Sequence, residues 1–246
     1  MKELQDEGYV LHGRAYHETS LLLEVVTAEH GRLGLVARGA RRSRGGLAGS
    51  LQPFHRLQLR WSPRGELHTL IGADELERLR LSAAMLPAAL YLNELLMRLL
   101  TRHEDCADIY VAYVRTLARL TEAEPGKLEP ALRDFEIDLL DGLGYGLTLE
   151  YQADSHEALD PKARYRYVEQ HGPVRVDGNV SGSFSGAALL AIAARDWREP
   201  ETLRAAKHVL RGALEQQLGP RGLRTRELLG GLARLRRMSD NNPTDS

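Results

Sequence analysis

The sequence predicts an α+β protein in which a small closed β-barrel precedes a series of α-helices. Strand-like segments separated by turn residues occupy the first eighty residues, and helical spacing of leucines replaces them after Leu81. The chain has 246 residues, 43% hydrophobic and 27% charged, which is enough for one or two domains with ample core. We expect a barrel domain at residues 1–80, a helical domain at residues 81–238 and a disordered polar tail at residues 239–246.

Five short strands are expected in the first domain. The fourth alternates clearly, with Leu57, Leu59 and Trp61 on one face and polar residues between them. Glu29-His30-Gly31 is typical of a tight hairpin turn, with glycine where positive φ is needed. Five short antiparallel strands favour an OB-fold barrel, which leaves no free sheet edge. The expected strands are Tyr9–Ala15, Leu21–Thr27, Leu33–Arg38, Arg56–Trp61 and Glu66–Ile71.

The remaining chain is predicted to be helical, interrupted by an irregular insert at residues 148–184. The insert has weak strand patterns at Tyr165–Glu169 and Val174–Val176. The glycines of Gly142–Gly146 follow a helix and lack the lysine of a phosphate loop, so a helix C-cap is expected there. Thr225 is a plausible N-cap of the last helix. The expected helices are Leu86–Thr101, Ile109–Leu120, Glu129–Leu143, Thr202–Leu218 and Thr225–Arg236.

Composition excludes several classes of protein. No run of 18 apolar residues occurs, so we expect no membrane span. The first residues form no apolar signal segment, and the single cysteine, Cys106, permits neither an intrachain disulfide nor a cysteine-based zinc site. A cytoplasmic protein is expected.

An acid-free stretch rich in arginine suggests contact with a polyanion. Eight arginines and no Asp or Glu lie between His30 and Gly65, where the chain's average acidity would place about five acids. A local excess of positive charge attracts nucleic acid even when the net charge is only −1. The alternative interpretation is a solvated surface loop. The candidate DNA-binding residues are Arg32, Arg38, Arg41, Arg42, Arg44, Arg56 and Arg60.

Motifs of catalysis are missing from the sequence. It has no phosphate-binding loop and no zinc-protease spacing, and neither His17-Glu18 nor His103-Glu104-Asp105 has a partner at a useful spacing. Asp154, His156 and His171 would be the ligands if the insert held a metal, although such histidine pairs are usually incidental. We therefore predict a protein that is not an enzyme and that needs no cofactor or metal.

Several segments, in their order and spacing, resemble the RecO family of DNA repair and recombination mediators. The likeness extends from about Gly8 to Arg237. The segments are Val10–Glu24, Gly31–Arg42, Leu51–Phe54, Tyr91–Leu96, Ala131–Leu140 with the following Leu143-Gly-Tyr-Gly, and Leu223–Leu229.

This resemblance implies an N-terminal OB-fold, a helical C-terminal domain and no catalytic residues. It also implies binding to single- and double-stranded DNA, strand annealing, engagement of the acidic tail of the single-stranded DNA-binding protein, and work with RecR in loading RecA. Many family members carry a four-cysteine zinc module after the Leu-Gly-Tyr-Gly segment, whereas here Tyr151 and Asp154 stand where the first cysteine pair would fall. We expect packing to hold the insert instead, through Tyr165, Tyr167, Val174 and Val176.

Binding of an acidic tail requires an apolar groove with a cation at its rim. Arg133 follows Leu132 on a predicted helix, so it is expected to point away from the core face. Tyr145, flanked by glycines, could wall a groove nearby. Arg133 and Tyr145 are the candidate partner-binding residues, against the plainer alternative that Arg133 is a solvated charge. Two other classes are alternatives: a protein–protein adaptor with an OB-like barrel, and a metal-dependent nuclease that scattered acids alone support.

Overall fold

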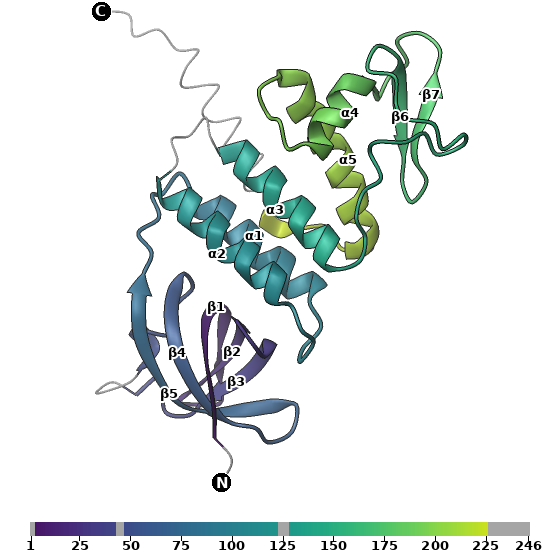
Figure 1. The fold of residues 1–246 in the computed structure, drawn as a ribbon. Helices are drawn as coiled ribbons and strands as arrows, with labels where there is room; N and C mark the ends of the chain where they lie inside the picture. Colours follow the sequence, from purple (N-terminus) through teal and green to yellow (C-terminus); the bar gives the residue numbers. More distant parts are fainter. Residues whose placement is uncertain (1–2, 43–46, 123–127, 226–246) are drawn as a thin grey trace, which may run out of the picture. The chain divides into compact units, whose positions relative to one another are not determined.

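The computed structural model describes residues 3–42, 47–122 and 128–225 (Figure 1). The chain divides into two compact units: Met1–Glu122 together with Leu223–Ser246, and Ala123–Gly222. The first two helices therefore fall in the same compact unit as the barrel. The predicted boundary between a barrel domain and a helical domain at residue 80 stays a prediction.

Five strands close into a barrel in the described part of the first unit, which confirms the predicted OB-fold. The strand order around the barrel is β1-β2-β3-β5-β4, and β4 pairs with β1. β3 and β5 run parallel and the other neighbours antiparallel. Pairing with β4 extends β1 back to Leu4, and β5 runs on to Arg78 although its last five residues are exposed and all but Leu76 are charged. The strands are β1 Leu4–Tyr16, β2 Ser20–Thr27, β3 Gly31–Ala37, β4 His55–Ser62 and β5 Leu67–Arg78.

The barrel interior is filled by alternate residues of its strands, as strand geometry requires. Leu57, Leu59 and Trp61 are buried in this core, as predicted, and Trp61 is only 1% exposed. The predicted turn before β3 is also confirmed, with Gly31 at a φ of +67°. A Cβ at Gly31 would lie 1.9 Å from the Glu104 carbonyl oxygen, because the segment after helix α1 (Leu86–Leu99) comes against this turn.

A buried polar chain joins β1 to the helices of the first unit. The Asn93 amide on α1 donates to the Leu11 carbonyl at 3.0 Å. Tyr113, on helix α2 (Ala107–Glu122), donates its hydroxyl to the Asn93 side-chain oxygen at 2.6 Å. The ring of Tyr113 meets Tyr9 edge-on with centroids 5.6 Å apart. Because these buried polar groups bind each other, they fix the helices on the barrel at little desolvation cost.

The second unit combines helices with a small antiparallel sheet of order β7-β6-β8. Tyr165 and Tyr167 of β6 are buried, whereas Val174 and Val176 of β7 are half-buried. The short helix α4 was not predicted, because its uniformly small and apolar sequence carries no amphipathic period. The helices and strands of the second unit are α3 Leu128–Gly142, β6 Arg164–Val168, β7 Gly172–Val176, β8 Ser183–Ser185, α4 Gly186–Ala193 and α5 Pro200–Leu218.

The link between α4 and α5 is anchored on α3. Arg195 donates to the Asp138 carboxylate at 2.7 Å, and the Trp197 indole donates to Asp134 at 2.9 Å. The predicted last helix beyond Thr225 and the predicted tail at residues 239–246 lie outside the described residues. Within the described ranges, no helix combines the length and apolar character that crossing a bilayer requires.

Candidate nucleic-acid interface

The densest part of the predicted DNA-binding segment follows β3 directly. The chain turns at Gly39, whose φ of +68° favours glycine. The backbone nitrogen of Arg42 donates to the Gly39 carbonyl at 3.1 Å, and that of Arg41 donates to the Thr19 carbonyl at 2.9 Å. The first bond closes the turn within the segment, and the second holds the segment against the β1–β2 turn. Arg44 lies outside the described residues.

Three arginines of this segment are free to meet an anion. The side chains of Arg38, Arg41 and Arg42 are exposed and form no ion pair with any residue that the structure describes. We call these three residues the basic edge. A guanidinium stays charged at any working pH and binds phosphate through two N–H groups. The basic edge can therefore take a phosphate without first breaking an internal ion pair with a described residue.

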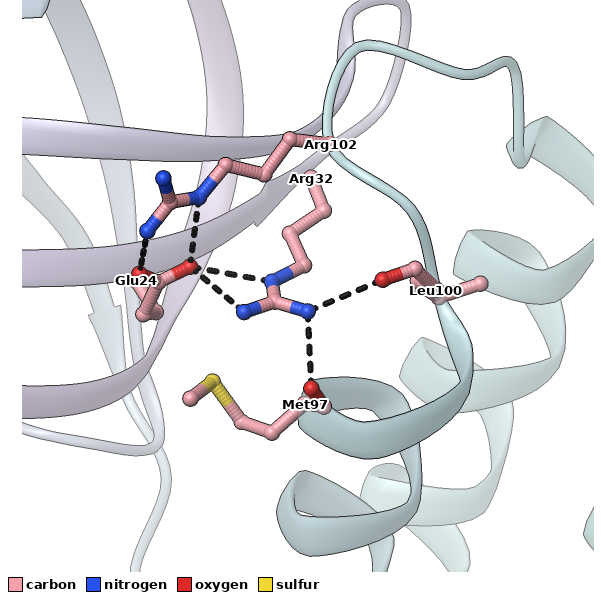
Figure 2. A network of polar contacts seen from close by, with 5 residues as sticks. All are labelled: Glu24, Arg32, Met97, Leu100 and Arg102. Atoms are coloured by element: carbon pink, nitrogen blue, oxygen red, sulfur yellow. Dashed lines mark hydrogen bonds and ion pairs between the residues drawn. The ribbon is translucent and has the colours of Figure 1, made fainter. Parts of the chain in front are cut away.

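Arg32 is engaged inside the protein (Figure 2). Its Nε and Nη2 each lie 2.9 Å from Glu24 Oε2, and Nη1 donates to the Met97 carbonyl at 2.7 Å and the Leu100 carbonyl at 2.9 Å. Arg102 holds the other Glu24 oxygen. The carbonyls at the end of α1 would otherwise lack helical partners. Arg32 thus joins β2, β3 and the end of α1, and its DNA-binding role stays a prediction with few N–H groups left to serve it.

The electrostatics of this network agree with its geometry. Burial alone would raise the pKa of Glu24, but the hydrogen bond and charge of Arg102 and of Arg32 outweigh burial and lower that pKa. The same contacts raise the pKa of Arg102. Glu24 is consequently ionised at neutral pH and neutralises positive charge that the sequence pattern assigns to the surface.

Arg56 and Arg60 are paired with acids on neighbouring strands. Arg56 binds the Glu7 carboxylate on β1, and Arg60 lies 3.4 Å from the Asp74 carboxylate on β5. Both arginine side chains are about two-fifths exposed. Exposed pairs of this kind contribute little stability, about 0–1 kcal/mol. DNA phosphate could replace either acid, although each exchange gains less than binding to a free arginine would.

Three residues that the sequence pattern did not assign to DNA binding lie near the basic edge. Arg14 near the end of β1 is exposed and has no ion pair within the described ranges, while Tyr16 and His17 form an aromatic pair at the β1–β2 turn. Their signal was present in the segment Arg14-Ala-Tyr-His, which alternates a cation with aromatic rings. Arg14, Tyr16 and His17 lie before the acid-free stretch in the sequence, and only the fold brings them beside it.

The structure corrects the expectation that Arg133 points away from the core face, and with it the alternative that Arg133 is a solvated charge. Arg133 is buried on α3, where it binds the carboxylate of Glu136, which is 1% exposed. Its Nε has no hydrogen-bond partner in the described part of the chain. The buried face of α3 includes both Leu132 and Arg133. Helical spacing from Leu132 predicted a narrower buried face that leaves Arg133 out.

Tyr145 lines a cavity to which Arg133 does not contribute. The Tyr145 side chain is exposed and lines a cavity of about 220 Å³ with Leu147, Tyr167, His171 and Gln217. Arg133 does not line this cavity. Nine helical residues separate Arg133 from the end of α3, which corresponds to roughly 14 Å of axial rise. The structure therefore does not bring the two candidate partner-binding residues together.

The described residues contain no group of three or more His, Cys, Asp or Glu side chains that could hold a metal ion. The backbone is left-handed at His156 and at Gln170, which precedes His171. The side chains of His156 and His171 are both exposed. Cys106 is buried, and burial raises the pKa of its thiol to about 11. A thiol with that pKa is neither a ready nucleophile nor a ready metal ligand at neutral pH.

Comparison with known proteins places these features in one family. Residues 1–77 match the family model "Recombination protein O N terminal", and residues 80–227 match "Recombination protein O C terminal". The chain is 44% identical to the DNA repair protein RecO of Methylococcus capsulatus over 92% of both chains. It is also 44% identical to the DNA repair protein RecO of Salmonella typhimurium, over 90% of this chain and 91% of that protein.

Proposed function

The chain belongs to the RecO family of DNA repair proteins, and we propose that it acts as a non-enzymatic mediator of recombination in the RecF pathway. In this proposal it binds single- and double-stranded DNA and anneals complementary single strands. It engages the acidic tail of the single-stranded DNA-binding protein and, with RecR, helps RecA to load.

The observation that carries the proposal is the basic edge. Arg38, Arg41 and Arg42 project from one end of an OB-fold barrel without an ion pair to any described residue. Barrels of this fold bind oligonucleotides on their strands and neighbouring loops. Binding to phosphates does not depend on sequence and brings two strands together by neutralising their charge. Annealing, which must tolerate any sequence, needs this kind of contact.

The test is the salt dependence of DNA binding. Four phosphate contacts to a single strand would give a log–log salt slope of roughly −3, at about −0.7 per contact. Replacing Arg38, Arg41, Arg42 and Arg44 by Ala should flatten this slope and weaken all sequences alike. A matched control removes four exposed arginines from the second unit, Arg166, Arg175, Arg204 and Arg211. It changes net charge equally and should leave the slope nearly intact.

Two outcomes would contradict this assignment. An unchanged slope in the first variant would move the site to Arg56 and Arg60; Trp61, in the barrel core, is too buried to stack on a base. Equal losses in both variants would show that net charge, rather than the basic edge, governs binding. Weak, salt-insensitive binding by the wild-type protein would favour a protein–protein adaptor. Cleavage of labelled DNA in magnesium would favour a nuclease.

The mediator role needs a separate assay. Complementary strands coated with the single-stranded DNA-binding protein should anneal when the chain is added, and the four-arginine variant should fail to anneal them. RecA loading on coated DNA should need this protein together with RecR. Loading that proceeds equally well without the chain would refute the mediator role while leaving DNA binding in place.

A further inference from the structure

The β1–β2 turn presents two aromatic rings on the surface of the barrel. Tyr16 ends β1 and His17 begins the turn, with ring centroids 4.2 Å apart and planes at 68°. His17 is exposed and Tyr16 half-buried. The φ of His17 is +51°, a left-handed conformation that costs a residue with a side chain some strain. The backbone therefore holds an imidazole in the open beside a tyrosine instead of placing glycine at the turn.

Strand register places these rings among free arginines. Tyr16 pairs with Ser20 and Leu21 pairs with Ala37, so Arg38 comes next to Ser20 on the far side from Tyr16. Arg14 lies two residues before Tyr16 and shares its face of β1. The bond from the Arg41 nitrogen to Thr19 ties the turn to the basic edge. Exposed arginines thus lie on both sides of the aromatic pair along the chain, with Arg14 on β1 itself and with Arg38 and Arg41 after β3, beyond β2.

One acid opposes this arrangement. Glu18 is exposed in the same turn, and the segments beside the turn carry three exposed arginines, Arg14, Arg38 and Arg41, that form no ion pair with a described residue. The local balance is therefore positive. In an edge-on aromatic pair, at least one ring keeps a face that the other does not cover. An uncovered aromatic face flanked by cations is the arrangement on which single-stranded nucleic acid stacks its bases.

We propose that Tyr16 and His17 form a stacking platform for one unpaired nucleobase, while the basic edge binds the adjoining phosphates. This inference rests on the DNA-binding role proposed above and deepens it, because it gives the site a preference for single strands. The bases of a duplex are stacked on each other, so their faces cannot reach the platform. Phosphate contacts, by contrast, are available in both forms of DNA.

The variants are chosen to keep the fold. Tyr16→Leu removes the ring but keeps an apolar side chain at the end of the strand. His17→Gly removes the imidazole and suits the left-handed backbone, so it should not destabilise the turn. Tyr16→Phe keeps the ring and is the matched control. Thermal unfolding of each variant is measured beside binding to a labelled oligo(dT) strand and to a duplex of the same length.

The Tyr16→Leu/His17→Gly double variant should bind oligo(dT) at least about fivefold more weakly, the lower limit for losing one base stack. Its affinity for the duplex should stay within about twofold of wild type. Its salt slope should equal the wild-type slope within error, because base stacking releases no counterions. Tyr16→Phe should match wild type. An oligonucleotide of abasic sites should bind wild type and double variant equally.

A direct optical readout completes the test. Tyr16→Trp places an indole in the platform, and stacking of a base should quench its fluorescence with oligo(dT) but not with the abasic strand or the duplex. The inference is overturned if the double variant keeps full affinity for oligo(dT), or if single-strand and duplex binding fall together. Failure of the proposed DNA-binding role is distinguishable, since the wild-type protein would then bind neither form in a salt-dependent way.

Discussion

Glu94 on α1 binds Thr225, which lies 131 residues further along the chain. Its carboxylate accepts hydrogen bonds from the Thr225 backbone nitrogen at 2.8 Å, from the Thr225 hydroxyl at 2.6 Å and from the Arg224 nitrogen at 2.9 Å. Between Glu94 and Thr225 the chain passes through the whole second unit. This contact therefore returns the chain to the first unit, and it uses the hydrogen of the Thr225 hydroxyl, whose oxygen stays able to accept a bond as the predicted helix N-cap.

Loss of this contact should lower stability in a pH-dependent way. Burial alone would raise the pKa of Glu94, but the hydrogen bonds from Thr225 and Arg224 outweigh it, so the folded pKa is lowered. A lowered pKa stabilises the fold above the unfolded value of about 4.3 and loses that stabilisation as pH falls through the folded pKa. Glu94→Gln should cost about 1–2 kcal/mol at pH 7 in urea unfolding.

The difference between wild type and Glu94→Gln should shrink as the pH is lowered below about 4. Glu104→Gln, which alters an exposed carboxylate of the same unit, is the control and should show no such difference. A cost that is constant with pH would mean that the carboxylate charge plays no part in the contact.

Arg32 and Arg38 should have opposite effects although only six residues separate them. Arg32→Lys cannot bind Glu24 and two carbonyls at once, because lysine lacks the planar fork. We expect a loss of about 1–3 kcal/mol in unfolding free energy with an unchanged DNA salt slope. Arg38→Ala should leave stability within about 0.5 kcal/mol and flatten the slope. A flattened slope in Arg32→Lys would restore Arg32 to the DNA-binding surface.

Gly31 and Gly65 provide a matched pair for the contact between the barrel and the segment after α1. Their φ values are +67° and +66°, but a Cβ at Gly31 would meet the Glu104 carbonyl at 1.9 Å, whereas one at Gly65 meets open space. Gly65→Ala should cost about 1 kcal/mol of backbone strain. Gly31→Ala should cost several times as much, since the α1–α2 segment must also move. Equal costs in thermal unfolding would show that this segment does not rest on the turn.

The barrel could be predicted because its strands carry their own alternation, as in Leu57, Leu59 and Trp61 of β4. Which arginines are free and which are ion-paired could not be predicted, because the acids that pair with them lie on other strands. Glu7 and Asp74 reach Arg56 and Arg60 diagonally across the sheet, so a stretch free of acids in the sequence is partly neutralised in space. Arg38, Arg41 and Arg42 follow the end of β3, where no neighbouring strand supplies an acid among the described residues.

Absence of structural zinc is expected from the missing cysteines. Elemental analysis of the purified protein should find less than a tenth of a zinc ion per chain, and EDTA should leave its thermal unfolding unchanged. One zinc per chain, removed by EDTA with loss of structure, would contradict this expectation. Asp154, His156 and His171 would then be the ligands to replace first.

The predicted tail-binding role of Arg133 needs a different variant from charge reversal. Arg133→Glu would place a second carboxylate beside the buried Glu136 and should unfold α3, since an unpaired buried charge costs about 3–5 kcal/mol. Arg133→Met alone would leave the buried Glu136 carboxylate without this partner, so it is made together with Glu136→Gln, whereas Arg133→Lys retains the charge.

If Arg133 orients an acidic tail peptide, Arg133→Met should weaken peptide binding about tenfold or more, the effect of losing a buried charge partner. Arg133→Lys should restore most of that binding, and both variants should bind naked DNA normally. Tyr145→Ala tests the cavity of Tyr145 separately, because Arg133 does not line that cavity. Unchanged peptide binding in Arg133→Met together with loss in Tyr145→Ala would transfer the tail site to the cavity of Tyr145. Full binding by both variants would remove both residues from the partner surface and leave the Arg133–Glu136 pair a structural feature of α3.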